Sequence, residues 1–212
     1  GKHIVHYSLE LNEAYVGLRY DTIFTGVANQ NLKYHKDDVQ SEMDKLKGDL
    51  IIKYYPTKSA SVNTISAHLK RITTLGTEVD MVIVDYGDIL RDTKFTREVR
   101  HALGNIYEDL RGLAGEFEVP IWTASQANRS ALDEDVIEAQ KVSESYQKVM
   151  TADFVMSLSR KVEDKIGNTG RFHVIKNRFG PDGITYPAKV NTNTGIITVS
   201  YTHLTLPTNR EV

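Results

Sequence analysis

Cysteine is missing from this chain of 212 residues. Its absence excludes disulfide bridges, a thiol nucleophile and any zinc site built from cysteine thiolates. The seven histidines are scattered, and the closest pair is His3 and His6. An odd spacing on a strand places two side chains on opposite faces, so we expect structural roles for this pair rather than metal binding.

Long apolar runs are missing as well. No segment approaches the roughly 20 apolar residues of a membrane-spanning helix, and the chain does not open on a charged and then apolar signal segment. We therefore expect neither secretion nor membrane insertion.

A strong net charge is the third absence. The balance is only −2, so any contact with nucleic acid must come from local loops rather than from the overall field.

The remaining composition, 40% hydrophobic and 25% charged, suits one α/β domain. Up to Ala152, strands alternate with helices, which predicts parallel pairing through right-handed crossovers. The expected strands cover 3–9, 50–55, 81–84 and 119–124, and the expected helices cover 13–19, 37–47, 61–73 and 96–117. Asn12 is a good N-cap for the first of these helices. The run 81–84 is apolar and rich in β-branched residues, which is typical of a strand buried on both faces.

After Ala152 the pattern changes. Four short strands are expected at 154–160, 172–177, 184–190 and 196–200, separated by turns rich in glycine and asparagine at 167–170, 180–183 and 191–195. This pattern predicts antiparallel hairpins. Because the first strand starts almost at residue 1, we expect a partial domain over 1–200. Residues 201–212 resemble a translated cloning adaptor, and we expect them to lie outside the domain.

Polar residues follow three of the expected parallel strands. Glu10 follows the first, Asp85 ends the strand 81–84, and Ser125 and Gln126 follow the strand 119–124. Ligands of open α/β sheets bind beyond the carboxyl ends of the strands. There an Asp can hold magnesium, a Glu can orient an attacking water, and an amide can contact a terminal phosphate. Taken singly, each residue is equally well explained as a solvated loop residue.

Two groups of cations complete the candidate residues. Lys176 and Arg178 have an i, i+2 spacing at a hairpin, so both point to one side and can reach phosphates across a subunit interface as arginine fingers do. An exposed charged turn is the alternative. The loops 91–97 and 128–146 carry further cations that can contact DNA phosphates. These are Arg91, Lys94, Arg97, Arg129 and Lys141. Five acidic residues in the second loop also allow much of it to face water.

In chain order, five segments resemble the DnaB-type replicative helicase family, especially its bacteriophage members. They are His6-Tyr7-Ser8-Leu9-Glu10, Val82-Ile83-Val84-Asp85-Tyr86, Ala124-Ser125-Gln126-Ala127-Asn128-Arg129, Ala152-Asp153-Phe154-Val155 and Lys176-Asn177-Arg178-Phe179-Gly180-Pro181-Asp182-Gly183. The resemblance implies a RecA-like P-loop NTPase core that uses ATP and Mg²⁺. It implies a parallel sheet with helices on both faces, followed by antiparallel hairpins.

The resemblance also implies roles for single residues. Glu10 would polarise the attacking water, and Asp85 would hold Mg²⁺. Asp85 and Ser125 would contact the nucleotide, and Gln126 would sense its γ-phosphate. Lys176 and Arg178 would act on the ATP of a neighbouring subunit, which implies a homo-oligomeric ring, normally a hexamer. Single-stranded DNA would pass through its channel, a primase and a helicase loader would be partners, and the location would be the cytoplasm of a bacterial or phage-infected cell.

The chain departs from the family pattern at one point. The glycine-rich loop that ends in Gly-Lys-Ser or Gly-Lys-Thr is absent, and Gly1-Lys2 cannot replace it because it leads directly into a strand. The strand before that loop, normally central in the sheet, is expected to be absent too. Without such a phosphate cradle nucleotide affinity falls. We expect this polypeptide alone to be inactive, and the longer parent protein to hydrolyse ATP and unwind DNA.

Three other functions remain open at this point. A RecA-type recombinase shares the core but forms filaments, and strand exchange without unwinding would identify it. A KaiC-like regulatory ring ATPase of the circadian-clock type need not bind DNA, which a gel shift against single-stranded DNA tests. An inactive interaction domain is the third possibility, and it fits poorly with carboxylates clustered at strand ends.

Overall fold

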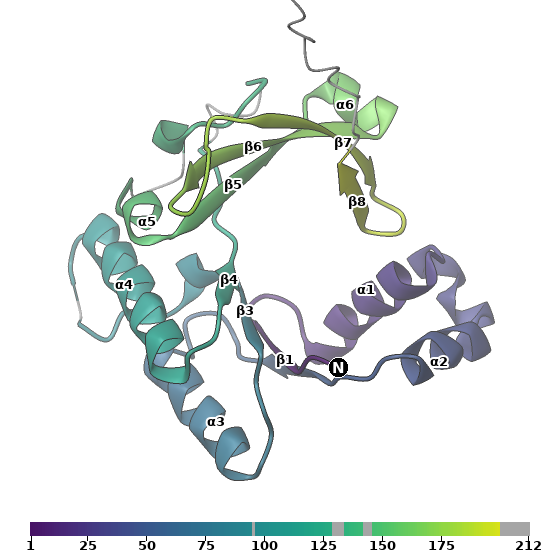
Figure 1. Ribbon diagram of the computed structural model, residues 1–212, viewed down its shortest axis with the longest axis horizontal. Coiled ribbons are helices and arrows are strands. Elements are labelled where there is room, and N and C mark those ends of the chain that lie inside the picture. The colour runs from purple at the N-terminus through teal and green to yellow at the C-terminus, as the bar shows by residue number, and fades with distance from the viewer. Residues whose placement is uncertain (95, 129–133, 142–145, 200–212) are drawn as a thin grey trace, which may run out of the picture.

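The computed structural model describes residues 1–199 with gaps at 95, 129–133 and 142–145. It contains two four-stranded sheets, one parallel and one antiparallel (Figure 1). The predicted α/β architecture, a parallel sheet followed by antiparallel hairpins, is confirmed. Residues 201–212, the predicted adaptor-like tail, lie outside the described residues.

The parallel sheet has the strand order β2-β1-β3-β4. Its strands are β1 (Ile4–Ser8), β2 (Leu50–Tyr54), β3 (Met81–Asp85) and β4 (Ile121–Thr123). Ser8 aligns with Tyr54 on one side and with Asp85 on the other, and Val84 aligns with Thr123. All four strands therefore end at the same edge of the sheet, which is where the candidate residues follow.

One face of the parallel sheet carries the hydrophobic core. Two helices, α3 (Val62–Thr74) and α4 (Val99–Phe117), lie on this side (Figure 1). Their apolar residues recur at helical spacing and pack on the alternate residues of β1 and β3. The most buried members of this core are Val5, Tyr7, Leu9, Ile65, Leu69, Val82, Val84 and Leu90.

The other face of the parallel sheet is covered less completely. Helix α1 (Glu13–Thr25) begins at the predicted N-cap, where the Asn12 side chain accepts a hydrogen bond from the Tyr15 backbone. Tyr20 of α1 contacts His6 on this face, and α1 pairs with α2 (Lys36–Asp44) across the 3-10 helix Asn29–Tyr34. The prediction that the strand 81–84 is buried on both faces was wrong. In β3 full burial alternates with half-burial, because the helices on this side leave part of the sheet open.

The antiparallel sheet has the order β5-β6-β7-β8. Its strands are β5 (Phe154–Ser159), β6 (Thr169–Asn177), β7 (Thr185–Asn191) and β8 (Ile196–Val199). Two short helices, α5 (Tyr146–Thr151) and α6 (Val162–Gly167), were not predicted. Because α6 occupies the connection between β5 and β6, the segment 167–170 is not the tight turn that its composition indicates. Asn168 ends α6 in the left-handed conformation, and β6 begins at Thr169.

The predicted helix 96–117 starts later than expected, at Val99. Asp92 explains the difference, because its carboxylate accepts hydrogen bonds from the backbone of Lys94 and of Thr96. Such local bonds offer the backbone an alternative to the first helical turn. The loop after β3 is therefore held in a defined turn before α4 begins.

Candidate functional site

The carboxyl edge of the parallel sheet brings Glu10 and Asp85 together. Backbone pairing continues one residue beyond β1, since the Leu9 N–H donates to the Asp85 carbonyl at 2.9 Å. Glu10 therefore leaves the sheet directly beside the end of β3. Within the described residues, neither carboxylate forms an ion pair or a side-chain hydrogen bond. Both remain available to solvent or to a ligand.

Tyr86, which follows Asp85, shows how closely the acidic groups gather. Partial burial raises the pKa of the Tyr86 phenol, and the negative charges of Glu10, Asp88 and Asp85 raise it further. All three carboxylates thus act on one hydroxyl group. The edge is an electronegative site of the kind that attracts a cation.

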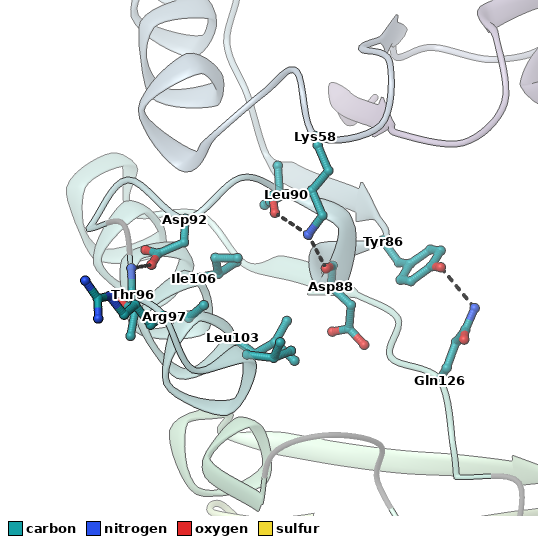
Figure 2. A pocket seen from close by; sticks show the side chains of 12 residues that line it. Lys58, Tyr86, Asp88, Leu90, Asp92, Thr96, Arg97, Leu103, Ile106 and Gln126 are labelled. Atoms are coloured by element: carbon teal, nitrogen blue, oxygen red, sulfur yellow. Dashed lines mark hydrogen bonds between the residues drawn. The ribbon is translucent and has the colours of Figure 1, made fainter.

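Gln126 lies at the same edge. Its side-chain amide donates to the Tyr86 hydroxyl at 2.9 Å, and Figure 2 shows the two side chains pointing toward one another. They share a pocket of about 420 Å³ between the loop after β3 and the start of α4, with Leu103 and Ile106 on its apolar wall. The structure therefore brings three of the predicted residues, Glu10, Asp85 and Gln126, to one edge.

Two residues at this edge escaped the sequence analysis. Asp88 accepts a hydrogen bond from the Tyr107 hydroxyl at 2.7 Å and one from the Ser125 hydroxyl at 3.1 Å. Lys148, only 2% exposed, donates to the same carboxylate at 2.8 Å and to the Ser125 hydroxyl at 3.1 Å. Ser125, which is predicted to contact the nucleotide, takes part in this cluster. A lysine in a short polar helix gives no sequence signal of burial, so Lys148 could not have been singled out.

Lys176 and Arg178 both contact the segment 149–153. The Lys176 ammonium donates to the carbonyls of Val149 and Met150 at the end of α5, at 3.0 and 2.7 Å. Burial lowers the pKa of Lys176, and the positive charge of Arg178 lowers it further. Arg178 binds the Asp153 carboxylate at 2.5 Å. In the described residues these cations contact α5 and Asp153, and no contact joins them to the strand-end residues of the same chain.

The predicted DNA-contacting cations differ in their surroundings. Arg91 and Arg97 are exposed and form no ion pair with the described residues, and Arg97 lines the pocket. Lys94 pairs with Asp109 at 3.4 Å, and Lys141 pairs with Glu134 at 3.2 Å. The remaining predicted residue, Arg129, lies outside the described part of the chain.

The oxygen atoms of this edge fit magnesium in one specific way. No group of three or more His, Cys, Asp or Glu side chains in the described residues is arranged to hold a metal ion. Mg²⁺ commonly uses one or two carboxylates and takes its other ligands from phosphates and water. The unpaired Asp85 carboxylate fits an ion that arrives with a nucleotide, and it does not fit a cage built entirely from protein.

Comparison with known proteins gives consistent matches. Residues 1–192 match the family model described as DnaB-like helicase C terminal domain. The DnaB-like replicative helicase of Enterobacteria phage T4 is 27% identical over 192 residues, which cover 85% of this chain and 40% of that protein. The replicative DNA helicase DnaB of Helicobacter pylori is 25% identical over 134 residues, or 61% of this chain and 28% of that protein.

Solved structures agree on the fold. One solved ATPase domain superposes with a TM-score of 0.77 at 20% identity, covering 92% of this chain and 74% of that one. A DnaB-like replicative helicase, studied with its interactions with primase, gives the same TM-score, identity and share of this chain, and 50% of its own chain is covered. The RadB recombinase superposes less well, with a TM-score of 0.57 at 14% identity over 93% of this chain and 78% of its own.

No helix within the described residues is both long and apolar enough to cross a membrane.

Proposed function

This chain belongs to the DnaB-like helicase C-terminal domain family, and from that premise we propose that it is the ATP-hydrolysing motor of a replicative DNA helicase. The chain spans 40% of the phage T4 relative and 28% of the Helicobacter pylori relative. The activity, substrates and partners of the whole protein are therefore part of the proposal. The parent protein hydrolyses ATP, moves along single-stranded DNA and separates the duplex.

The observation that carries the proposal is the meeting of Glu10, Asp85 and Gln126 at one sheet edge. Bound Mg²⁺–ATP supplies the phosphoanhydride and the positive charge that neutralises its phosphates. Asp85 would hold the metal through its carboxylate. Glu10 accepts a hydrogen bond from the attacking water and orients it. Gln126, held by Tyr86, presents its amide to the γ-phosphate.

The sequence holds no glycine-rich loop ending in Gly-Lys-Ser or Gly-Lys-Thr, so the source of the phosphate cradle is part of the proposal. In the described sheets β4 and β5 are end strands, and each has an unpaired edge. Trp122 of β4 is 48% exposed and Phe154 of β5 is 38% exposed, with their ring centroids 6.1 Å apart. Open apolar edges of this kind call for a covering strand. The unpaired edges of β4 and β5 can each accept a further strand, and we propose that this polypeptide by itself does not hydrolyse ATP.

Lys176 and Arg178 act in trans in this proposal. Their positions at the end of α5, away from the strand-end residues of their own chain, support a role on the ATP of a neighbouring subunit. The parent protein is then a homo-oligomeric ring, and a hexamer is proposed. Arg91 and Arg97 are exposed and suited to DNA phosphates. A primase, a helicase loader and a cytoplasmic location complete the proposal.

The test is the ATPase rate of the full-length protein with and without single-stranded DNA, while increasing amounts of an Arg178→Ala subunit are mixed in. DNA-stimulated activity that falls more steeply than the fraction of wild-type subunits supports sites completed in trans. The matched control is Arg160→Ala in the same half of the molecule. An ATPase rate that changes neither with DNA nor with added Arg178→Ala subunits would overturn the helicase assignment in favour of a regulatory ATPase.

The similarity to the RadB recombinase concerns the fold alone. Strand exchange by the full-length protein, without unwinding of a forked duplex, would assign it to the recombinases instead.

A further inference from the structure

Lys148 is the most buried charged side chain at the sheet edge. It is 2% exposed, while its partner Asp88 is 15% exposed. Its ammonium lies 2.8 Å from the Asp88 carboxylate and 5.5 Å from the centre of the Tyr107 ring. Burying an ammonium group is costly unless it is paired and hydrogen-bonded, so the geometry of this cluster is held tightly.

The cluster joins the two loops that carry the candidate active-site residues. Asp88 comes three residues after Asp85, and Ser125 directly precedes Gln126. Because Lys148 and Ser125 both donate to the same Asp88 oxygen, the loop after β3 and the loop after β4 are fastened together. A shift of Lys148 therefore disturbs the hydroxyl of Ser125, the residue that precedes Gln126.

The same short helix also holds the other functional cations. Lys148 lies in the middle of α5, and the carbonyls of Val149 and Met150 that follow it receive the Lys176 ammonium. Asp153, two residues after α5, binds Arg178 at 2.5 Å and Arg111 of α4 at 3.0 Å. Within this helix, the residue that contacts the sheet edge is thus followed directly by the two residues that contact the hairpin.

We propose that α5 links the two sites mechanically and that Lys148 is the positioning residue of this link. The inference rests on the proposed function and deepens it. A change at Gln126, where the γ-phosphate is sensed, is transmitted through Ser125, Asp88 and Lys148 to α5. From α5 it reaches Lys176 and Arg178, which face the neighbouring subunit. Through this link, the nucleotide state of one site changes the positions of the two cations that act on the neighbouring site.

A purely structural ion pair is the competing explanation, and a coupling measurement separates the two. In the full-length protein, Lys148→Met is expected to lower kcat for DNA-stimulated ATP hydrolysis by about 10- to 100-fold while KM for ATP changes less, because misplacing catalytic groups costs rate rather than ground-state binding. Lys148→Arg keeps the charge and is expected to restore part of the rate. Lys70→Met, which breaks the exposed pair of Lys70 with Glu116 on α4, is the matched control.

A double-mutant cycle tests the link itself. If α5 connects the two sites, Lys148→Met combined with Lys176→Ala lowers kcat by less than the product of the two single losses. If the kcat losses of the two single variants multiply in the double variant, the two sites are independent and the link is overturned. A lower melting temperature with unchanged kcat in Lys148→Met would do the same.

Hydrogen exchange gives a readout that does not depend on ATP hydrolysis. In Lys148→Met, amide exchange is expected to rise both in 123–128 and in 146–153, and in Lys70→Met it stays at the wild-type level in both segments. Faster exchange confined to 146–153 would contradict the link. A wild-type protein without DNA-stimulated ATPase would instead overturn the proposed function, and the exchange pattern would still decide the link.

Discussion

The parallel half and the antiparallel half of the molecule bury their side chains differently. The main hydrophobic cluster runs from Val5 to Val119 and lies entirely in the parallel half. The strands of the antiparallel half contribute few buried apolar side chains, namely Val174, Ala188 and Val190. This half depends more on its strand ladder and on polar contacts.

The difference matches what each half holds. The parallel half fixes Glu10, Asp85 and Gln126 at the edge of a packed sheet, where small displacements are costly. The antiparallel half presents Lys176 and Arg178 through hydrogen bonds to α5 and Asp153. Polar contacts can be exchanged for others at lower cost than a packed core can be rearranged. We therefore expect the parallel half to carry out ATP hydrolysis and the antiparallel half to provide contacts that can rearrange.

The largest expected effect tests the chemistry of the parallel half. Glu10→Gln keeps the shape of the side chain and removes the carboxylate that orients water. In the full-length protein kcat is expected to fall by about 100- to 10,000-fold, with ATP binding retained. Steady-state ATPase rates and nucleotide titration measure both quantities. Glu163→Gln, an exposed change on α6 in the antiparallel half, is the control, and an equal loss there would break the comparison.

An intermediate effect compares the packing of the halves. Val82 of β3 is 0% exposed and Val190 of β7 is 5% exposed, so Val→Ala removes similar groups at both positions. Two buried methyl groups contribute about 1.6 kcal/mol. A cavity in the rigid core adds to that loss, so Val82→Ala is expected to cost about 2 to 3 kcal/mol. Val190→Ala is expected to cost less, because it packs on Gly170 outside the main cluster. Urea unfolding that gave the reverse order would contradict this account.

The smallest effect at neutral pH concerns Asp164 in the antiparallel half. The Lys161 backbone N–H, the Thr169 hydroxyl and the Arg171 guanidinium lower the pKa of Asp164 to about 2. The unfolded chain titrates at about 3.9. Because the folded pKa is the lower one, the stabilisation is complete above about pH 4 and is lost as the pH falls toward 2.

Unfolding free energies measured between pH 6 and pH 2 check this expectation. This range extends about two pH units on either side of the unfolded pKa. Asp164→Asn is expected to be less stable than wild type at neutral pH and to lose less stability in acid. Asp182→Asn, in the exposed turn between β6 and β7, serves as the control. An Asp164→Asn protein with the wild-type slope would exclude Asp164 as the source of the acid sensitivity.

The two halves also differ in how well the sequence predicts them. In the parallel half, Asn12 is the N-cap of α1, as the sequence indicates, and the apolar spacing of 61–73 predicts α3. Such signals are local, because the cap and the helix period lie within a few residues of each other. In the antiparallel half the sequence predicts all four strands but not α5 or α6. Helices of six residues show less than two turns of periodicity, so their composition resembles that of a turn.

The sequence by itself determined the order of strands and helices in the parallel half, the four strands of the antiparallel half, the family, and the residues that follow the parallel strands. Each of these depends on neighbouring residues, whose spacing the sequence displays directly. Only the tertiary structure decided that Lys148 is buried against Asp88 and that Ser125 belongs to their cluster. It alone decided that Lys176 binds the end of α5. These contacts join residues 23 to 60 positions apart, and their partners are selected by how helices and sheets pack rather than by any local pattern.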